Sequence, residues 1–500
     1  MFRIDITFAA VLLTMFLCTP APILFQVQAQ DWAPADNPLM TRWSEETDRN
    51  NSPVNIVVFV ADDLGYNDIG PYGNSQVRTP NLDKLSERAL KFNEAFAGSP
   101  TCSPSRASIY TGLYPFRNGA HANHTGIKEG VKTLPKYLQE LGYRTALAGK
   151  YHVGPIEAYP FELIKTTNVP EPGYEDRGLL WTDLNMEPVN EWLGKVSDNE
   201  PFLLIVNDHS PHVVWPENPE YDYREVDIPS FHIDTDETRQ SRSRYYTDIT
   251  KMDANVGKLM KSLEEHGLSE NTIFIFTADQ GPQWAFGKWS LYDYGIKVPL
   301  LMKWPDVIKE QLETNAMISL VDLVPTFIEI AGGNPDNQQN FDGESFLAVI
   351  KEEKDDHHER VFASHSGDGT MNRTPLRMLR TSDYKYILNL APQTRYDTHM
   401  NKADDHDGGR EYWPSWQTMS FVSRHAASVL WRYHYHPAEE LYDIKSDPNE
   451  VVNLAKNPDY KEVIEELRIQ MTDWRQQQGD SETGAYERER QNIHVPYIFE

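Results

Sequence analysis

The sequence predicts an α/β fold whose main sheet is buried on both faces, followed by a smaller α+β domain. Two observations predict it. Short, nearly continuous apolar runs alternate with helical patterns over most of the chain, which is typical of strands covered by helices on both sides. Beyond about residue 355 the pattern changes to short strand-like runs, an aromatic-rich stretch and one long helix.

The individual elements follow from these patterns. Apolar runs predict main-sheet strands at residues 55–61, 144–149, 202–207, 272–278 and 299–303. Helical spacing predicts helices over residues 81–95, 134–141, 245–266 and 323–330. The last part contains expected strands at residues 361–364, 376–381 and 385–389, a Trp/Tyr/His-rich stretch at 412–435 and a helix at 459–477. We therefore expect a main domain over residues 31–355 and a smaller one over residues 356–500.

Residues 1–30 have the pattern of a secretory signal peptide. Arg3 precedes an apolar run at residues 8–17, and Ala29 offers a small residue for cleavage. An uncleaved membrane anchor is the alternative, because the apolar stretch at residues 6–27 is almost long enough to span a bilayer. Two prolines and the lack of a basic flank favour cleavage. We expect an exported protein, periplasmic or extracellular, without stable membrane insertion.

Cysteine content and charge narrow the function classes. Cys18 lies in the expected signal peptide, so Cys102 would be the sole cysteine of the mature chain and could form no internal disulfide. A lone thiol in an exported protein is either a special, reactive group or a buried, inert one. The net charge of −28 argues against nucleic acid or an anionic membrane as a partner.

Four of the expected strands end in polar clusters, and this regularity indicates where a functional site lies. The clusters are Asp62 and Asp63; Lys150 and His152; Asp208, His209 and His212; and Asp279 and Gln280. In open α/β sheets, ligands bind outside the carboxyl ends of the strands, so we expect one site built from these four ends.

The carboxylates of this site predict a hard cation. Considered singly, each aspartate could be a turn or helix-capping residue and not a metal ligand. Together, Asp62, Asp63 and Asp279 would repel one another without a cation, and Gln280 can add an amide oxygen. Oxygen ligands of this kind favour Ca²⁺, with Mg²⁺ second and zinc excluded.

The segment around Cys102 predicts an anion site at a helix terminus. Pro104 fits the first turn of a helix, which places Cys102 where orphan N–H groups favour negative charge. Arg106 lies about one turn further on and can reach back toward the same point. The alternative is an ordinary capped helix that begins near a cysteine.

The motif Cys102-Ser103-Pro104-Ser105-Arg106 resembles the Cys-x-Pro-x-Arg motif of the type I, formylglycine-dependent sulfatases. Blocks similar to those of this family follow in the family's order at residues 60–65, 79–83, 149–154, 278–281 and 440–454, so the resemblance covers roughly residues 53–480. It implies an alkaline-phosphatase-like mixed sheet sandwiched by helices, and a C-terminal α+β domain carrying an antiparallel sheet. It also makes residues 31–355 the catalytic domain.

The resemblance implies that Cys102 is oxidised to formylglycine (3-oxoalanine) by a formylglycine-generating enzyme or an anaerobic sulfatase-maturating enzyme. The hydrated aldehyde is a geminal diol. One hydroxyl attacks sulfur, and the second allows sulfate to leave as the aldehyde re-forms. In the family this residue also contacts the metal, so the implied ligand set is Asp62, Asp63, residue 102, Asp279 and Gln280. Gln280 departs from the asparagine of many members.

The resemblance also assigns roles to basic residues. Lys150, Arg106 and Lys288 are similar to the family's cations that hold the sulfate oxygens. His152 matches the histidine that assists sulfate release, and His212 matches the one that contacts sulfate and protonates the leaving group. His209 is open between a functional and a structural role.

Within the family, the resemblance is closest to the heparan N-sulfatase branch, on residues 149–155 and 159–161. This implies a sulfated saccharide substrate, either N-sulfoglucosamine of heparan type or a marine algal glycan such as ulvan. The charge of −28 would repel a polyanion, so we expect action on chain ends or short fragments. Candidate sugar contacts are His365, Arg373 and Arg377.

Two other functions compete. One is a phosphodiesterase or phosphonate hydrolase of the alkaline phosphatase superfamily, which the motif alone does not exclude. The other is a non-catalytic protein that binds sulfated glycans, which the filled reactive positions argue against.

Overall fold

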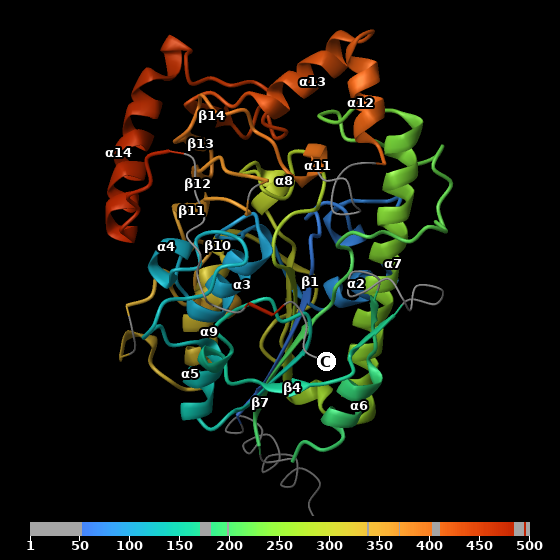
Figure 1. The fold of residues 1–500 in the computed structure, drawn as a ribbon. Helices are drawn as coiled ribbons and strands as arrows, with labels where there is room; N and C mark the ends of the chain where they lie inside the picture. Colours follow the sequence, from blue (N-terminus) through green and yellow to red (C-terminus); the bar gives the residue numbers. More distant parts are fainter. Residues whose placement is uncertain are drawn as a thin grey trace, which may run out of the picture. The chain divides into compact units, whose positions relative to one another are not determined.

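An eight-stranded mixed sheet forms the centre of the fold (Figure 1). Its order is β10-β2-β9-β8-β1-β7-β3-β4. The strands are β1 Asn55–Ala61, β2 Leu90–Phe96, β3 Arg144–Gly149, β4 Glu162–Ile164, β7 Phe202–Asn207, β8 Thr272–Ala278, β9 Leu300–Lys303 and β10 Leu312–Ser319. Only β9 runs against its neighbours β2 and β8; the other pairs are parallel. The mixed sheet expected from the resemblance is confirmed.

The computed structural model describes residues 53–170, 182–197, 200–337, 340–369, 371–402, 411–484 and 495–496. The described residues from Pro53 onward belong to one compact unit. The expected signal peptide therefore lies outside the described residues, and the boundary at residue 355 stays a prediction. In the described ranges, no helix has both the length and the apolar character needed to cross a bilayer.

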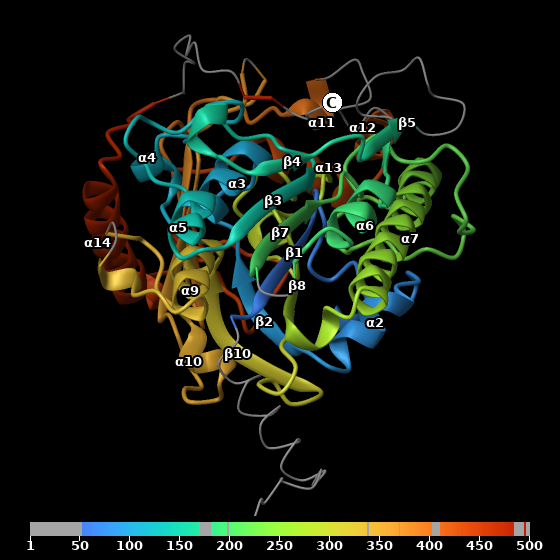
Figure 2. The ribbon, with the colours of Figure 1, turned by 90° about the horizontal axis from the view of Figure 1, so that it is seen from below.

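Helices cover both faces of the sheet, as predicted. The helices described between β1 and β11 are α2 Pro80–Ser86, α3 Cys102–Thr111, α4 Pro115–Asn118, α5 Leu134–Glu140, α6 Glu187–Leu193, α7 Asp236–Glu265, α8 Asp293–Ile296, α9 Leu323–Ile330 and α10 Leu347–Ile350. Figure 2 shows α2, α6 and α7 on one side of the sheet and α3, α5 and α9 on the other. Strands β1, β7 and β8 are buried along their whole length, which explains their continuous apolar sequences.

The C-terminal part contains a four-stranded antiparallel sheet, as expected. Its strands, in spatial order, are β11 Arg360–His365, β12 Leu376–Thr381, β13 Tyr384–Asn389 and β14 Glu439–Asp443. Helix α14, Lys461–Gln478, packs on this sheet, with Trp474 stacked on Phe362 at a ring distance of 4.8 Å. The aromatic-rich stretch forms α12, Trp413–Ser420, and α13, Arg424–His434, after the short α11, His399–Lys402. A small hairpin pairs β5, Asn168–Pro170, with β6, Thr182–Leu184.

One expected helix is wrong. The predicted helix at residues 81–95 is instead α2 followed by strand β2. Leu82, Leu85 and Phe92 have helical spacing, but Leu90 and Phe92 pair with β9 across the sheet. This pairing is long-range, so local spacing could not show it. Helix α7 also begins earlier than expected, at Asp236, because the Thr235 side chain accepts a hydrogen bond from the backbone N–H of Thr238 and caps it.

The topology places the four polar clusters together. Strands β8, β1, β7 and β3 are consecutive and parallel in the sheet. Ala61 pairs with Ala278, and Gly149 pairs with Asn207, so all four strands end at the same edge. The residues that follow each strand therefore face one another across a short distance.

Candidate active site

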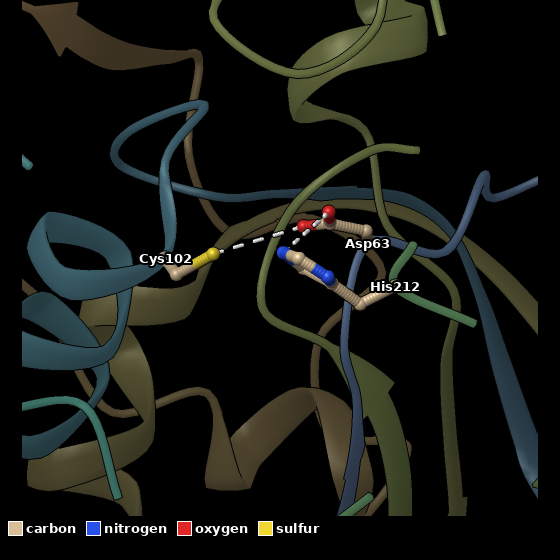
Figure 3. Close-up of side chains that lie close together, drawn as sticks. All are labelled: Asp63, Cys102 and His212. Carbon is tan, nitrogen blue, oxygen red and sulfur yellow. Dashed lines mark hydrogen bonds and ion pairs between the residues drawn. The ribbon is translucent and has the colours of Figure 1, made fainter. Parts of the chain in front are cut away.

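Cys102 is the first residue of α3, a helix that is buried along its whole length. Its Sγ lies 3.7 Å from Oδ1 of Asp63 and 3.4 Å from Nε2 of Gln280. Figure 3 shows Cys102 and His212 both directed at the Asp63 carboxylate. Burial raises the pKa of the Cys102 thiol, so the unmodified side chain is protonated at neutral pH and a poor nucleophile.

Asp62 is fixed as an anion between two cations. Its Oδ1 lies 3.2 Å from Nη2 of Arg106, its Oδ2 lies 2.5 Å from Nζ of Lys150, and all three side chains are fully buried. Burial alone would raise the pKa of Asp62, but the charges of Lys150 and Arg106 hold it well below its usual value. Arg106 also donates from Nε to Oδ2 of Asp279 at 2.9 Å and so connects the ends of β1 and β8.

Asp63 and Asp279 are less well compensated. Burial raises the pKa of Asp63 to about 6, although Lys288 donates to its Oδ2 at 2.8 Å. Burial likewise raises the pKa of Asp279 to about 8, despite Arg106. The resident lysines and arginine therefore do not fully stabilise three buried carboxylates, which leaves room for a further positive charge.

The donor set fits a hard divalent cation. Ligand atoms of Asp62, Cys102 and Asp279 lie within 4.8 Å of one another. The amide of Gln280 donates from Nε2 to Asp63, and its Oε1 is buried without a hydrogen-bond partner among the described residues. Three carboxylates and a spare amide oxygen suit Ca²⁺ or Mg²⁺. Asp62, Asp63 and Asp279 would hold the ion, and Gln280 has an oxygen to offer.

His212 and Lys288 form a hydrogen-bonded pair. The carbonyl of Val213 accepts from Nδ1 of His212 at 2.5 Å, which fixes the proton on Nδ1 and leaves Nε2 as an acceptor. Nζ of Lys288 lies 3.0 Å from that Nε2. Burial, and next Lys288, hold the pKa of His212 well below its usual value, so the imidazole is neutral. Lys288 therefore donates a hydrogen bond to the neutral imidazole of His212.

His152 belongs to a chain of polar contacts that the sequence did not reveal. Its Nε2 lies 2.9 Å from Nδ1 of His124, and Nε2 of His124 lies 3.6 Å from Oδ1 of Asp368. Asp368 also accepts from Nδ2 of Asn123 and from Nε1 of Trp289, both at 2.9 Å. His124 and Asp368 follow none of the four strands, so the strand-end argument could not find them.

The remaining candidates separate into two groups. His209 belongs to the site, because its Nδ1 lies 3.7 Å from Asp62 and its ring stacks on His212. Burial lowers the pKa of His209 to about 3. Asp208 is structural, since its carboxylate accepts from the backbone N–H of Ser210 and from Asn255.

The prediction that Arg377 contacts the sugar is wrong. It is fully buried, and its guanidinium binds Asp480, Glu482 and the carbonyl of His365, so no donor is left for a substrate. His365 and Arg373 stay predictions.

Buried carboxylates, cations and histidines at the carboxyl ends of parallel strands define the class as an alkaline-phosphatase-like hydrolase. The chain matches the sulfatase family profile over residues 54–333 and the profile "N-sulphoglucosamine sulphohydrolase, C-terminal" over residues 281–413. The chain therefore belongs to the sulfatase family of hydrolases, as the motifs predicted.

Individual relatives agree with this membership. An ulvan-active sulfatase from Formosa agariphila is 31% identical over 85% of this chain and 80% of its own length. Human N-sulphoglucosamine sulphohydrolase is 29% identical over 84% of this chain and 90% of its own. The structure of the phosphonate monoester hydrolase of Agrobacterium radiobacter is similar with a TM-score of 0.64, at 18% identity over 87% of this chain and all (100%) of that one. The fold alone therefore does not separate sulfate from phosphonate chemistry.

Proposed function

We propose that the protein removes sulfate groups from sulfated saccharides, with a formylglycine made from Cys102 as nucleophile and Ca²⁺ as cofactor. The observation that carries this proposal is the position of Cys102. It lies at the N-terminus of α3 with Sγ against Asp63, within a buried set of three carboxylates and three cations. A helix N-terminus and resident cations together suit an anionic group such as a sulfate ester.

The surrounding side chains have separate roles in the proposed reaction. Arg106 and Lys150 keep Asp62 ionised, which holds one metal ligand ready. Lys288 donates to His212, and Nε2 of His212 can pass that proton to the oxygen or nitrogen that leaves. A hydrated formylglycine would supply one hydroxyl for attack on sulfur and a second for release of sulfate. Bound Ca²⁺ would neutralise charge on the sulfate oxygens.

The substrate proposal rests on the relatives and on charge. The two relatives are named for activity on ulvan and on N-sulphoglucosamine, and both names denote sulfated saccharides. A chain with a net charge of −28 repels long polyanions, which favours chain ends and short fragments. We propose an exo-acting enzyme on such ends, whether the sulfate is O- or N-linked.

A substrate panel with matched variants tests the chemistry. The wild type, Cys102→Ala and Cys102→Ser are compared on N-sulfoglucosamine, sulfated rhamnose ends, an aryl sulfate, an aryl phosphate diester and a phosphonate ester. We expect catalytic sulfate release by the wild type alone, because serine can accept sulfate but lacks the second hydroxyl needed to release it. Faster turnover of the phosphorus esters would refute the proposal.

Mass spectrometry of the peptide that carries residue 102 tests the nucleophile separately. We expect the mass of the aldehyde or its hydrate in protein from its native host. An unmodified cysteine there would favour a non-catalytic glycan-binding protein and would contradict the mechanism.

We also propose that the protein is exported, on the signal-peptide pattern of residues 1–30. N-terminal sequencing of the mature protein is expected to show cleavage near Ala29. An intact Met1 in the cytoplasmic fraction would contradict export.

A further inference from the structure

A second cluster of metal-ligating side chains lies outside the Cys102 site. Asp322 stands between β10 and α9, and His357 and His358 lie on the segment that leads into β11. One ligand atom from each of the three residues lies within 4.8 Å of the other two. The side chains are 0%, 7% and 17% exposed, in that order. None of the three contributes to the sulfatase site described above.

The distances in this cluster are close to those of a metal site. Nε2 of His358 lies 2.9 and 3.0 Å from the two oxygens of Asp322, and Nε2 of His357 lies 3.6 Å from Oδ2. Zinc binds such atoms at about 2.0–2.2 Å, so neighbouring ligands of a tetrahedral ion are separated by about 3.3 Å. The observed separations fall on both sides of that value.

Hydrogen bonding alone does not explain both histidines. The Asp322 carboxylate already accepts from the backbone N–H groups of Ser319 at 2.8 Å and Glu344 at 2.9 Å, and then from His358. A simple ion pair therefore accounts for His358. His357 is also buried with Nε2 turned to the same carboxylate, but its 3.6 Å distance from Oδ2 is longer than a normal hydrogen bond. A buried imidazole nitrogen without a partner is costly unless it binds something.

We propose that Asp322, His357 and His358 bind a zinc ion, with water in the fourth position, which fastens the segment before β11 to the start of α9. Two imidazoles and one carboxylate are a donor set that zinc prefers, whereas the oxygen-rich set at Cys102 suits calcium. The backbone N–H groups of Ser319 and Glu344 orient the carboxylate, as outer hydrogen bonds do in metal sites. A cavity of about 680 Å³ lined by both histidines gives the ion a route from solvent.

Zinc titration of the full chain tests this site. The protein is stripped of metal, saturated with Ca²⁺ and titrated with Zn²⁺ by calorimetry, and a parallel sample receives Co²⁺ for its visible absorption. We expect one zinc equivalent and a tetrahedral cobalt spectrum in the wild type. His357→Asn should weaken zinc binding by more than about tenfold. Losing a group that only hydrogen-bonds to a metal ligand already weakens binding by about that much, and the loss of a ligand should cost more. His266→Asn is the matched control, because His266 is exposed after α7 and its Nε2 lies 3.1 Å from Oδ1 of Asn190, far along the chain from the proposed zinc ligands.

Thermal unfolding provides the second measurement. Zinc should raise the Tm of the wild type and of His266→Asn and leave that of His357→Asn unchanged. His357→Asn is preferred over a change at Asp322, because Asp322 caps backbone groups and its loss would disturb folding. Zinc binding of equal strength in His357→Asn and the wild type, or no zinc binding in either, overturns the proposal. These readouts do not depend on sulfatase turnover.

Discussion

Replacing Arg377 by methionine tests whether this buried arginine stabilises the C-terminal part of the fold. Its Nε lies 2.7 Å and its Nη2 3.0 Å from the two oxygens of Asp480, and Nη2 lies 2.5 Å from Glu482. Arg377 and Asp480 are both fully buried. Methionine fills much of the same volume and removes the charge, so the change isolates the ion pair.

The expected loss can be worked from these contacts. Removing one partner of a buried ion pair costs about 3–5 kcal/mol. Asp480 keeps Nε of Arg475 at 2.6 Å, and the Glu482 side chain is 17% exposed, so neither carboxylate is left without compensation. We therefore expect the free energy of unfolding to fall by about 3 kcal/mol, the lower end of that range.

Arg468→Met is the matched control. Arg468 binds both oxygens of Glu439 at 2.5 and 2.6 Å, but the two side chains are 44% and 26% exposed. Its loss should cost less than about 1 kcal/mol, because water screens an exposed pair. Urea unfolding followed by circular dichroism measures both variants. Equal losses would refute the reasoning, and a raised KM with unchanged stability in Arg377→Met would restore Arg377 as a sugar contact.

The same pair gives a pH dependence with a definite sign. Burial alone would raise the pKa of Asp480, but Arg377 and Arg475 lower it below its usual value. The stabilisation is therefore present above the unfolded pKa of about 3.9 and is lost as the pH falls through the lower, folded value. Arg377→Met should lose less stability than the wild type on acidification from about pH 5 to pH 3. Parallel losses over that range would contradict this linkage.

Three further predictions concern the active site. Chelation with EGTA should abolish sulfate release, and Ca²⁺ should restore it better than Zn²⁺; full activity after chelation would exclude the metal. Lys288→Ala should lower kcat by at least about 100-fold, because His212 loses its proton donor, and a near-wild-type kcat would remove Lys288 from the mechanism. His124→Gln should lower kcat about tenfold with little change in KM, because His152 loses the contact that orients it; an effect on KM alone would assign His124 to substrate binding.

Much of the fold could be predicted because it is encoded locally. The strands that became β1, β3, β7 and β8 are apolar runs with abrupt polar ends, and their bounds agree with the structure. Helix α9 was predicted for a similar reason. Strand β2 was missed because only its pairing with β9 and β10 makes it a strand, and nothing in its own spacing reports those partners.

The same distinction between local and long-range information applies to the residues of the active site. Asp62, Lys150 and Asp279 directly follow parallel strands, so topology brings them together once the strands are known. His124 and Asp368 lie on loops 244 residues apart and meet through side-chain contacts that no spacing predicts. Arg377 looked like a free cation in the sequence, because the acidic partners that bury it lie more than 100 residues further along the chain.

The burial of Cys102 determines whether this residue is modified before or after the chain folds. The residue is 1% exposed at the start of a fully buried helix, so an enzyme that must bind the peptide around Cys102 cannot do so while α3 is folded. Any oxidation of this cysteine by an enzyme is therefore expected before folding, while residues 99–106 are not yet packed in the core. A chain that folds first keeps an unmodified thiol at residue 102 and must unfold locally before a maturing enzyme can bind the peptide around it.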